Sequence, residues 1–327
     1  MTIPWPESAK PADSCPVFVA GVSQTGKSIL SMLLTSHPSI AIPRRESSFW
    51  TGIYKRFGDL KHGGNFGRCL EAALRQRDWD GCALDAESIQ RSFGDGPPTY
   101  VRLYALLHQQ YAQLTGKRRW GAHGQQIEDV AEILLAEFPG ARIIHLVRDP
   151  RDRYAVVVKN RRGRGQQLWP GQLAVEAARW RRSMMRAHKR GLRYPLRYRV
   201  VRYESLVTDP QVVTEGICRF LDEQTLAAES GIPDSWNLRD GNFFARWSTA
   251  NIGMFAEELS ARELWYLQSK LAAQMSAYGY EPASTQLSLT DRLVHYSVEW
   301  PVYQARTWFY HVRSAAVLRG FEKGTQA

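Results

Sequence analysis

The sequence has few cysteines, and they form no pattern. Its 327 residues include only Cys15, Cys69, Cys82 and Cys218, with no C-x-x-C pair and no Cys/His spacing. This scatter indicates neither a zinc site nor a disulfide framework. Free thiols persist in a reducing compartment, so the cytoplasm is the expected location.

Long apolar runs and a leader segment are also missing. No run reaches the length of a membrane span, and residues 1–14 are polar and punctuated by proline, without the apolar core of a signal peptide. We therefore expect a flexible N-terminus over residues 1–14 and a protein that is soluble or at most peripheral to a membrane.

Acidic residues are in deficit. The chain has 43 Lys and Arg against 32 Asp and Glu, a formal net charge of +11. Nine basic residues and no acid lie between Arg179 and Arg199. Such a run is either a solvated helix face or a surface for an anion, and charge alone does not separate nucleotide, nucleic acid, polysaccharide and membrane as partners.

One stretch near the start carries a phosphate-binding pattern. A short apolar run ends in Gly21, and Gly21-Val-Ser-Gln-Thr-Gly-Lys-Ser28 then fits G-x-x-x-x-G-K-[ST] before a helix-like run. Glycines let backbone N–H groups curl around an anion, the helix N-terminus adds partial positive charge, and Lys27 supplies a full one.

A second strand, loop and helix follow later in the chain. The buried-type strand 142–147 ends in Arg148-Asp-Pro-Arg-Asp152 before another helix. Further strands are expected over 39–43 and 197–203, a loop over 44–50, and helices over 29–36, 126–138, 210–221 and 261–278. This alternation predicts an α/β fold with a P-loop-type parallel sheet covered by helices on both faces, plus helical insertions.

The C-terminal region is aromatic and basic. Residues 289–321 include Trp300, Trp308 and Phe309 interleaved with arginines, and Pro301 is expected to break the region into two helices. We expect a single α/β domain over 15–288 and a helical extension over 289–327. The extension either covers the core, touches a membrane surface or forms a homodimer contact.

Four segments in order resemble the sulfotransferase family that uses 3′-phosphoadenosine-5′-phosphosulfate (PAPS), particularly its bacterial and tyrosylprotein-type branches. The segments are 17–38 with its final His37-Pro38, 138–152 with Ile-Ile-His-Leu-Val-Arg148, 201–221 with Val-Arg-Tyr203-Glu-Ser, and Trp247-Ser-Thr-Ala-Asn-Ile-Gly-Met-Phe255 with the later helix. They span most of the chain. The ordered set is more specific than any single motif.

The resemblance assigns the first loop to the 5′-phosphosulfate. The loop residues expected to bind this group are Ser23, Gln24, Thr25, Gly26, Lys27 and Ser28. Gln24 stands where the family usually has a basic residue. In this sequence the nearest basic residue of the loop is Lys27, three positions later. Lys27 is therefore the expected stabiliser of the bridging oxygen as the sulfuryl group leaves.

The remaining nucleotide contacts are also implied by the resemblance. Arg148 matches the arginine on the 3′-phosphate, a group that suits a fork of donors. Val156 stands where the family usually places a serine on the same phosphate. Tyr203 is expected near the adenine. A covering loop is expected to contribute Ser248, Thr249, Asn251 and Gly253.

Two residues compete as the general base that takes the hydroxyl proton of the acceptor. Glu46, in Arg44-Arg-Glu-Ser-Ser48, matches the catalytic glutamate of the tyrosylprotein-type and bacterial branches. His123, in Trp120-Gly-Ala-His-Gly124, falls near the catalytic histidine of cytosolic relatives. Both remain candidates at this point.

The resemblance thus implies a PAPS-dependent sulfotransferase that needs no metal. A hydroxyl on a carbohydrate, lipid-linked or small-molecule acceptor would receive the sulfuryl group, and adenosine 3′,5′-bisphosphate would leave. No nucleic-acid partner is expected. One alternative is a P-loop kinase or ATPase, for which Asp149 or Asp85 would have to hold magnesium with Ser28. Another is a basic nucleic-acid- or membrane-binding protein that has lost catalysis.

Overall fold

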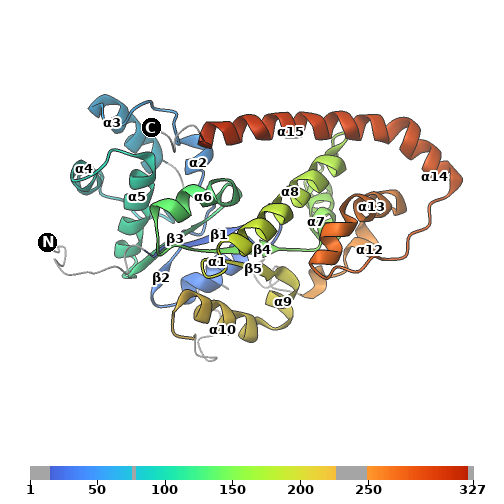
Figure 1. Cartoon of the computed structure of the whole chain (residues 1–327), viewed down its shortest axis with the longest axis horizontal. Coiled ribbons are helices and arrows are strands. Elements are labelled where there is room, and N and C mark those ends of the chain that lie inside the picture. Colours follow the sequence, from blue (N-terminus) through green and yellow to red (C-terminus); the bar gives the residue numbers. More distant parts are fainter. Residues whose placement is uncertain (1–14, 76–78, 226–248, 323–327) are drawn as a thin grey trace.

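The computed structural model describes residues 15–75, 79–225 and 249–322, with the backbone alone from residue 316 on (Figure 1). The predicted flexible N-terminus, residues 1–14, lies outside these ranges. A five-stranded sheet lies at the centre with helices around it, and a long C-terminal helix runs along one side (Figure 1). The predicted α/β fold with a helical C-terminal extension is confirmed.

The sheet is parallel throughout its described pairings, with strand order β2-β3-β1-β4-β5. The strands are β1 (Val17–Ala20), β2 (Ile40–Ala41), β3 (Arg119–His123), β4 (Arg142–Val147) and β5 (Tyr198–Arg202). Parallel neighbours require crossover connections, and the helices supply them. All five carboxyl ends therefore lie along one edge of the sheet.

The helices of the first two thirds of the chain cover the sheet. They are α1 (Lys27–Ser36), α2 (Phe49–Gly52), α3 (Gly63–Leu74), α4 (Ala86–Gly94), α5 (Tyr100–Leu114), α6 (Ile127–Glu137), α7 (Pro150–Gly163), α8 (Gln172–Arg193), α9 (Tyr203–Thr208) and α10 (Pro210–Leu221). Capping residues set the N-termini of three of these helices. The side chains of Asp85, Thr99 and Asp149 accept hydrogen bonds from the first backbone N–H groups of α4, α5 and α7.

Strand side chains alternate between two apolar clusters because successive residues point to opposite faces. Val17 and Val19 belong to the cluster that includes α1, α9 and α10, whereas Phe18 and Ala20 belong to the cluster that includes α2 to α6. Both clusters are fully buried at β1. This two-sided burial explains the continuous apolar run that precedes Gly21.

The rest of the chain adds a third apolar cluster beside the sheet. Its helices are a 3₁₀ turn (Thr249–Asn251), α12 (Phe255–Glu258), α13 (Ala261–Ala277), α14 (Leu289–Val294), a π-helix (His295–Glu299) and α15 (Trp300–Glu322). Trp180 of α8, Leu267 of α13 and Tyr303 of α15 share this cluster. None of the described helices is long and apolar enough to cross a membrane.

Several element boundaries differ from the predictions. The strand expected over 39–43 is only Ile40–Ala41, and α2 begins at Phe49 inside the expected loop. β3 was not predicted, because Arg119-Trp-Gly-Ala-His123 carries little intrinsic strand preference and becomes a strand through pairing with β1 and β2. Strand 142–147 and helix 210–221 have the predicted bounds.

The predicted break into two helices at Pro301 is not an interruption: the backbone is helical from Leu289 to Glu322 and only changes helix type. The π-helix over His295–Glu299 joins α14 to α15, and Pro301 is the second residue of α15. A proline lacks the N–H that would bond to the carbonyl four residues earlier, so the wider turns just before it accommodate the lost bond.

Candidate functional site

The carboxyl edge of the sheet gathers residues from five separate stretches of sequence. β1 leads into the loop 21–26, β3 ends in His123, β4 is followed by Arg148, β5 is followed by Tyr203, and the segment after β2 carries Glu46. Ligands of open parallel sheets bind outside the carboxyl ends of the strands, near the point where the chain reverses strand order. Here β1 lies between β3 and β4 and marks that point.

The two glycines of the phosphate-binding pattern are required by the backbone. Gly21 and Gly26 have φ angles of +131° and +91°, which side chains rarely tolerate. A Cβ at Gly21 would lie 2.5 Å from the Leu146 carbonyl oxygen, and one at Gly26 would lie 2.6 Å from the Tyr203 ring. The loop therefore packs tightly against β4 and the residue after β5, and only glycine fits at both ends.

The loop ends at the N-terminus of α1. Gly26 is the N-cap and offers no side chain to bond the first amides of the helix. Thr25 Oγ1 donates to the Val22 carbonyl at 2.8 Å, which holds the turn closed. Amide N–H groups at such a helix start, with the helix dipole behind them, form a site for an anion.

Lys27 is the first residue of α1, and its ammonium group is buried. Nζ donates to the Val22 carbonyl at 2.9 Å and lies 3.1 Å from Glu46 Oε1. Its side chain is only 2% exposed, against 36% for Glu46. Burial lowers the pKa of Lys27, and the negative charge of Glu46 opposes this shift. The structure thus brings together two of the three predicted catalytic residues.

His123 lies beside this pair and holds the segment that carries Glu46. Its Nε2 is 3.2 Å from the Arg44 carbonyl, and its own carbonyl accepts the Ser47 N–H at 3.2 Å. Because a carbonyl only accepts, Nε2 carries the proton and Nδ1 has the lone pair. Nδ1 is buried without a hydrogen-bond partner, and burial lowers the pKa of the imidazole.

Arg148 connects the phosphate loop to the covering loop. Its guanidinium donates to the carbonyls of Gln24 at 3.2 Å and Asn251 at 2.8 Å, and it lies over the Tyr203 ring at 4.3 Å. The residue is buried, and its Nε has no hydrogen-bond partner. Arg148 therefore makes no surface ion pair with Asp149, which instead pairs with Arg151 at 2.7 Å.

Asp152 anchors the described part of the covering loop. Its carboxylate accepts the N–H groups of Gly253 at 2.8 Å and Phe255 at 3.1 Å. Thr249 and Asn251 form the 3₁₀ turn just before these residues. Burial raises the pKa of Asp152 to about 6, although the hydrogen bond from Gly253 opposes the shift. The predicted ligand residue Ser248 lies outside the described residues.

Arg153 is a supporting residue that sequence reasoning missed. It is 1% exposed, its Nε donates to the Ser23 carbonyl at 2.9 Å, and it forms a buried ion pair with Glu176 of α8. This contact ties the phosphate loop to α7 and α8. The sequence gives no sign of this role, because many basic residues lie between Arg148 and Arg164 and only the position of Arg153 on the helix directs its side chain inward. Val156, on the same helix, is half-buried.

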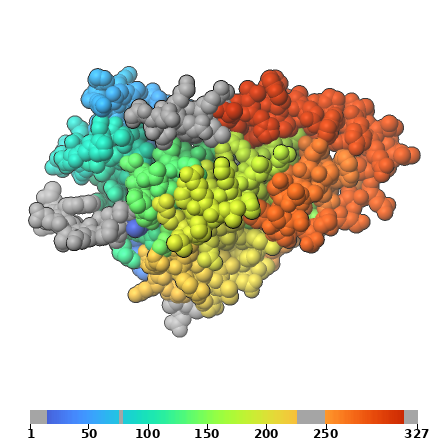
Figure 2. All heavy atoms as spheres, viewed as in Figure 1, coloured from blue at the N-terminus to red at the C-terminus, as the bar shows by residue number. Residues whose placement is uncertain are grey.

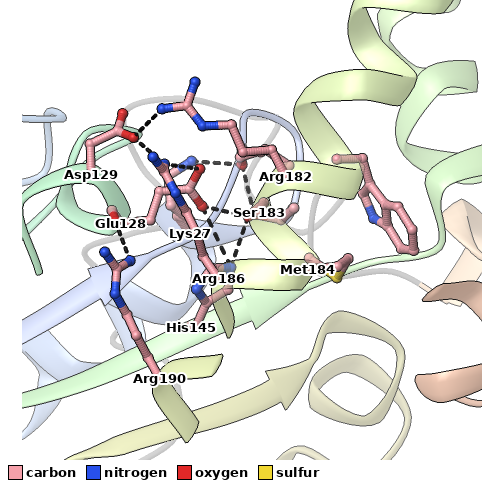
Figure 3. A network of polar contacts seen from close by, with 12 residues as sticks. Lys27, Glu128, Asp129, His145, Arg182, Ser183, Met184, Arg186 and Arg190 are labelled. Atoms are coloured by element: carbon pink, nitrogen blue, oxygen red, sulfur yellow. Dashed lines mark hydrogen bonds and ion pairs between the residues drawn. The ribbon is translucent and has the colours of Figure 1, made fainter. Parts of the chain in front are cut away.

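A polar network lies under Lys27 (Figure 3). Glu128 of α6 is buried, accepts a hydrogen bond from Ser183 of α8, and lies 3.6 Å from His145 of β4. Burial raises the pKa of Glu128 and lowers that of His145 to about 3, so this histidine is neutral. The charge of Glu128 also acts on Lys27, so two carboxyl groups, those of Glu46 and Glu128, favour its charged form.

Part of the basic run 179–199 belongs to this network and is not a solvated face. Arg182 and Arg186 pair with Asp129, and Arg190 donates to the Glu128 carbonyl (Figure 3). The position of each arginine around the axis of α8 decides which of them face α6. Sequence reasoning could not have assigned these partners, because the acids lie some fifty residues earlier on another helix.

The fold and the loop define a P-loop-type α/β protein. The chain belongs to the sulfotransferase family, whose family model matches residues 16–226. It is thus a sulfotransferase family enzyme. No curated protein sequence matches it.

Solved structures agree with this fold. The sulfotransferase domain of the Synechococcus PCC 7002 olefin synthase is 22% identical, with a TM-score of 0.54 over 81% of this chain and 94% of that one. The sulfotransferase domain from the curacin biosynthetic pathway is 18% identical, with a TM-score of 0.56 over 82% of this chain and 99% of that one. At these identities the likeness establishes the fold alone.

Proposed function

We propose that this protein transfers the sulfuryl group of PAPS to a hydroxyl acceptor and releases adenosine 3′,5′-bisphosphate. The observation that carries the proposal is the meeting of Lys27, Glu46 and Arg148 around one phosphate loop. The donor, when bound, supplies an activated sulfuryl group on a phosphate leaving group. Carbohydrate, lipid-linked and small-molecule hydroxyls are the acceptor classes that we propose.

The residues present fit such a donor. Gly21 and Gly26, at the two ends of the loop, leave no room for a Cβ, and the first amides of α1 lack a capping side chain. Arg148 keeps a buried, unbonded Nε and stacks its guanidinium on Tyr203. Loop amides suit a 5′-phosphosulfate, a forked guanidinium suits a 3′-phosphate, and an aromatic ring suits a base.

Lys27 carries the positive charge for the leaving phosphate in this proposal. A buried ammonium group stabilises developing negative charge more strongly than an exposed one, because water does not screen it. Its present partner Glu46 keeps that charge balanced at 3.1 Å. The family usually has a basic residue at the position of Gln24. In this chain Lys27 therefore supplies the cation of the loop.

Glu46 is the general base that we favour. Its carboxylate is 36% exposed and can meet an incoming hydroxyl, whereas the free lone pair of His123 at Nδ1 is buried. A base must come within hydrogen-bond reach of the proton that it removes. We assign His123 as a positioning residue, since its two hydrogen bonds fix the segment that carries Glu46.

The decisive test of the donor is calorimetric comparison of adenosine 3′,5′-bisphosphate with ADP and ATP. We expect binding of adenosine 3′,5′-bisphosphate at least about tenfold tighter than ADP, because a forked arginine pairing with a further phosphate adds on the order of 1.5–3 kcal/mol. An Arg148→Lys variant should lose most of this preference. Tighter binding of ADP would sink the proposal.

A further inference from the structure

A basic groove lies between α8, α13 and α15. Its volume is about 520 Å³, and no acidic residue lines it. The cationic and titratable side chains of its walls are Arg181, Arg182, Arg186, Lys189, Lys270 and His311. Figure 2 shows the surface of α8 in yellow-green beneath α15 in red and beside α13 in orange.

Several of these cations have no acidic partner. Arg182 and Arg186 pair with Asp129, but Arg181 and Lys189 are exposed and form no ion pair within the described parts of the chain. The positive charge of Arg181 also lowers the pKa values of Lys270 and His311, after the larger effect of burial. Like charges gathered in one groove repel one another unless an anion binds there.

The groove also has apolar lining residues. They are Met185 of α8 and Leu271 of α13, together with alanines of α8. A site lined by both apolar and cationic side chains suits a molecule with a negative group on an apolar body. Anionic phospholipids have this chemistry.

The outward side of α15 carries large apolar residues. Trp308 is 60%, Phe309 61% and Val312 47% exposed. At 3.6 residues per turn, these side chains fall within about 100° of one another around the helix axis. Exposed aromatic residues at helical spacing are unusual on a solvated surface and mark a contact with another phase or partner.

The stripe and the groove share one helix. Gln304, Thr307 and His311 of α15 line the groove, and the apolar stripe lies on the next side of the same helix. Arg306 and Arg313 flank the stripe on its other edge, where both are exposed. The stripe of α15 is thus bordered by Arg306 and Arg313 on one edge and, on the other, by the groove, whose cations come from α8 and α13.

We propose that this face binds an anionic membrane surface, with the α15 stripe (Trp308, Phe309 and Val312) entering the interface and the groove holding lipid headgroups. A second copy of the chain fits less well. A two-fold dimer brings the same patch against itself, so the unpaired cations of the groove would face one another. The inference does not depend on the proposed function.

The test is sedimentation of the full chain with vesicles of phosphatidylcholine alone or mixed with phosphatidylglycerol. We expect binding to the mixed vesicles that weakens as salt is raised, because salt screens surface charges. Arg181→Glu with Lys189→Glu should lower the partition coefficient at least about 25-fold, since each basic residue contributes about fivefold. Trp308→Ser with Phe309→Ser should lower it at least about tenfold.

A matched control separates this face from net charge. Arg91 of α4 and Arg219 of α10 are exposed, and Arg91→Glu with Arg219→Glu changes the net charge equally. This control should bind vesicles nearly as well as the wild type. All variants should keep their affinity for adenosine 3′,5′-bisphosphate. A failure of the membrane proposal can therefore be told apart from a failure of the proposed donor.

Three outcomes would overturn the proposal. Equal binding to both kinds of vesicle would remove the role of the cations. If the Arg91 and Arg219 control lost as much vesicle binding as the Arg181 and Lys189 variant, net charge alone would explain the effect. Absence of vesicle binding, together with a dimer mass that the Trp308 and Phe309 substitutions halve, would assign the stripe to a second copy of the chain.

Discussion

At the scale of single residues, Lys27 holds the most constrained charge of the site. It is buried between Glu46 and the Val22 carbonyl, and its position at the start of α1 fixes where its ammonium group points. Arg148 and Arg153 also contact the loop, but Lys27 is the cation that pairs with Glu46. Its substitution therefore tests the chemistry of the site directly.

We expect Lys27→Met to lower kcat by about 10²- to 10³-fold, because one preorganised charge at a transition state contributes about this much. Steady-state sulfuryl transfer at saturating PAPS measures the effect. Lys61→Met, at an exposed position, should leave kcat unchanged. A kcat near that of the wild type in Lys27→Met would exclude Lys27 from the reaction.

Glu46 and His123 are separated by comparing pH profiles. We expect Glu46→Gln to lower kcat by about 10²- to 10⁴-fold and to abolish the acidic limb of the kcat profile, because the base is gone. His123→Ala should lower kcat less and keep that limb. His123→Asn, whose amide can still donate to the Arg44 carbonyl, should restore part of the loss.

The opposite pattern would reverse the assignment. Loss of the acidic limb in His123→Ala, with the limb intact in Glu46→Gln, would make the histidine the base. Affinity for adenosine 3′,5′-bisphosphate should change little in any of these variants, since neither side chain belongs to the proposed nucleotide contacts.

At the scale of elements, a buried carboxyl group of α7 helps to hold the described part of the covering loop. Asp152 has a pKa raised by burial to about 6, so the folded state holds its proton more tightly than the unfolded chain does. Its contribution to the free energy of unfolding therefore falls as pH rises from about 4 to about 6, and it is constant above that window.

We expect Asp152→Asn to remove this dependence. The free energy of unfolding of the variant minus that of the wild type should rise by on the order of 2 kcal/mol from pH 4 to pH 7. At every pH the variant also carries a constant cost, because its amide faces the two N–H donors. Urea unfolding at both pH values measures the change. Asp95→Asn, at an exposed position, should keep the wild-type dependence. Parallel curves for Asp152→Asn and the wild type would contradict the prediction.

The pairing of α7 with α8 is a second element-scale feature. Arg153 bonds to the Ser23 carbonyl and to Glu176, and both partners of the ion pair are buried. Glu176→Gln leaves the arginine without its countercharge, and we expect a loss of about 3–5 kcal/mol in the free energy of unfolding. Chemical denaturation measures it. Glu258→Gln, in the more exposed pair with Arg162, should cost less than about 1 kcal/mol.

At the scale of the whole molecule, the C-terminal helices are packed onto the α/β core. Tyr303 of α15 is buried and lies 4.7 Å from the Tyr266 ring, and Lys270 lies over the Trp300 ring at 4.0 Å. The predicted alternative in which the extension covers the core is thus part of its role. The same helix leaves its outer stripe exposed, so covering the core and binding a surface are compatible.

We expect Tyr303→Ala to lower the free energy of unfolding by about 3–4 kcal/mol, since it removes a buried aromatic side chain. Affinity for adenosine 3′,5′-bisphosphate should stay within about twofold, because the contacts of Tyr303 lie in the apolar cluster around α8 and α13 and not at the carboxyl edge. Thermal unfolding and calorimetry check both points. A large loss of nucleotide affinity would mean that α15 acts on the site.

The sequence by itself determined the fold class and the loop. Alternating apolar strands and amphipathic helices require a covered parallel sheet, and Gly21, Gly26 and Lys27 are recognisable because their spacing follows from local backbone geometry. Strand 142–147 was predictable for the same reason, since its six residues have a nearly continuous apolar pattern. These features depend on neighbours in sequence.

Only the tertiary structure decided which distant side chains meet. β3 is a strand because it pairs with its neighbours. The Nδ1 lone pair of His123 is buried because Nε2 faces the Arg44 carbonyl. Within the basic run 179–199, Arg190 became a buried network residue while Arg181 and Lys189 stayed exposed, and Arg153 of α7 became buried as well. Helix register and packing set these outcomes, and both depend on contacts between residues far apart in the chain.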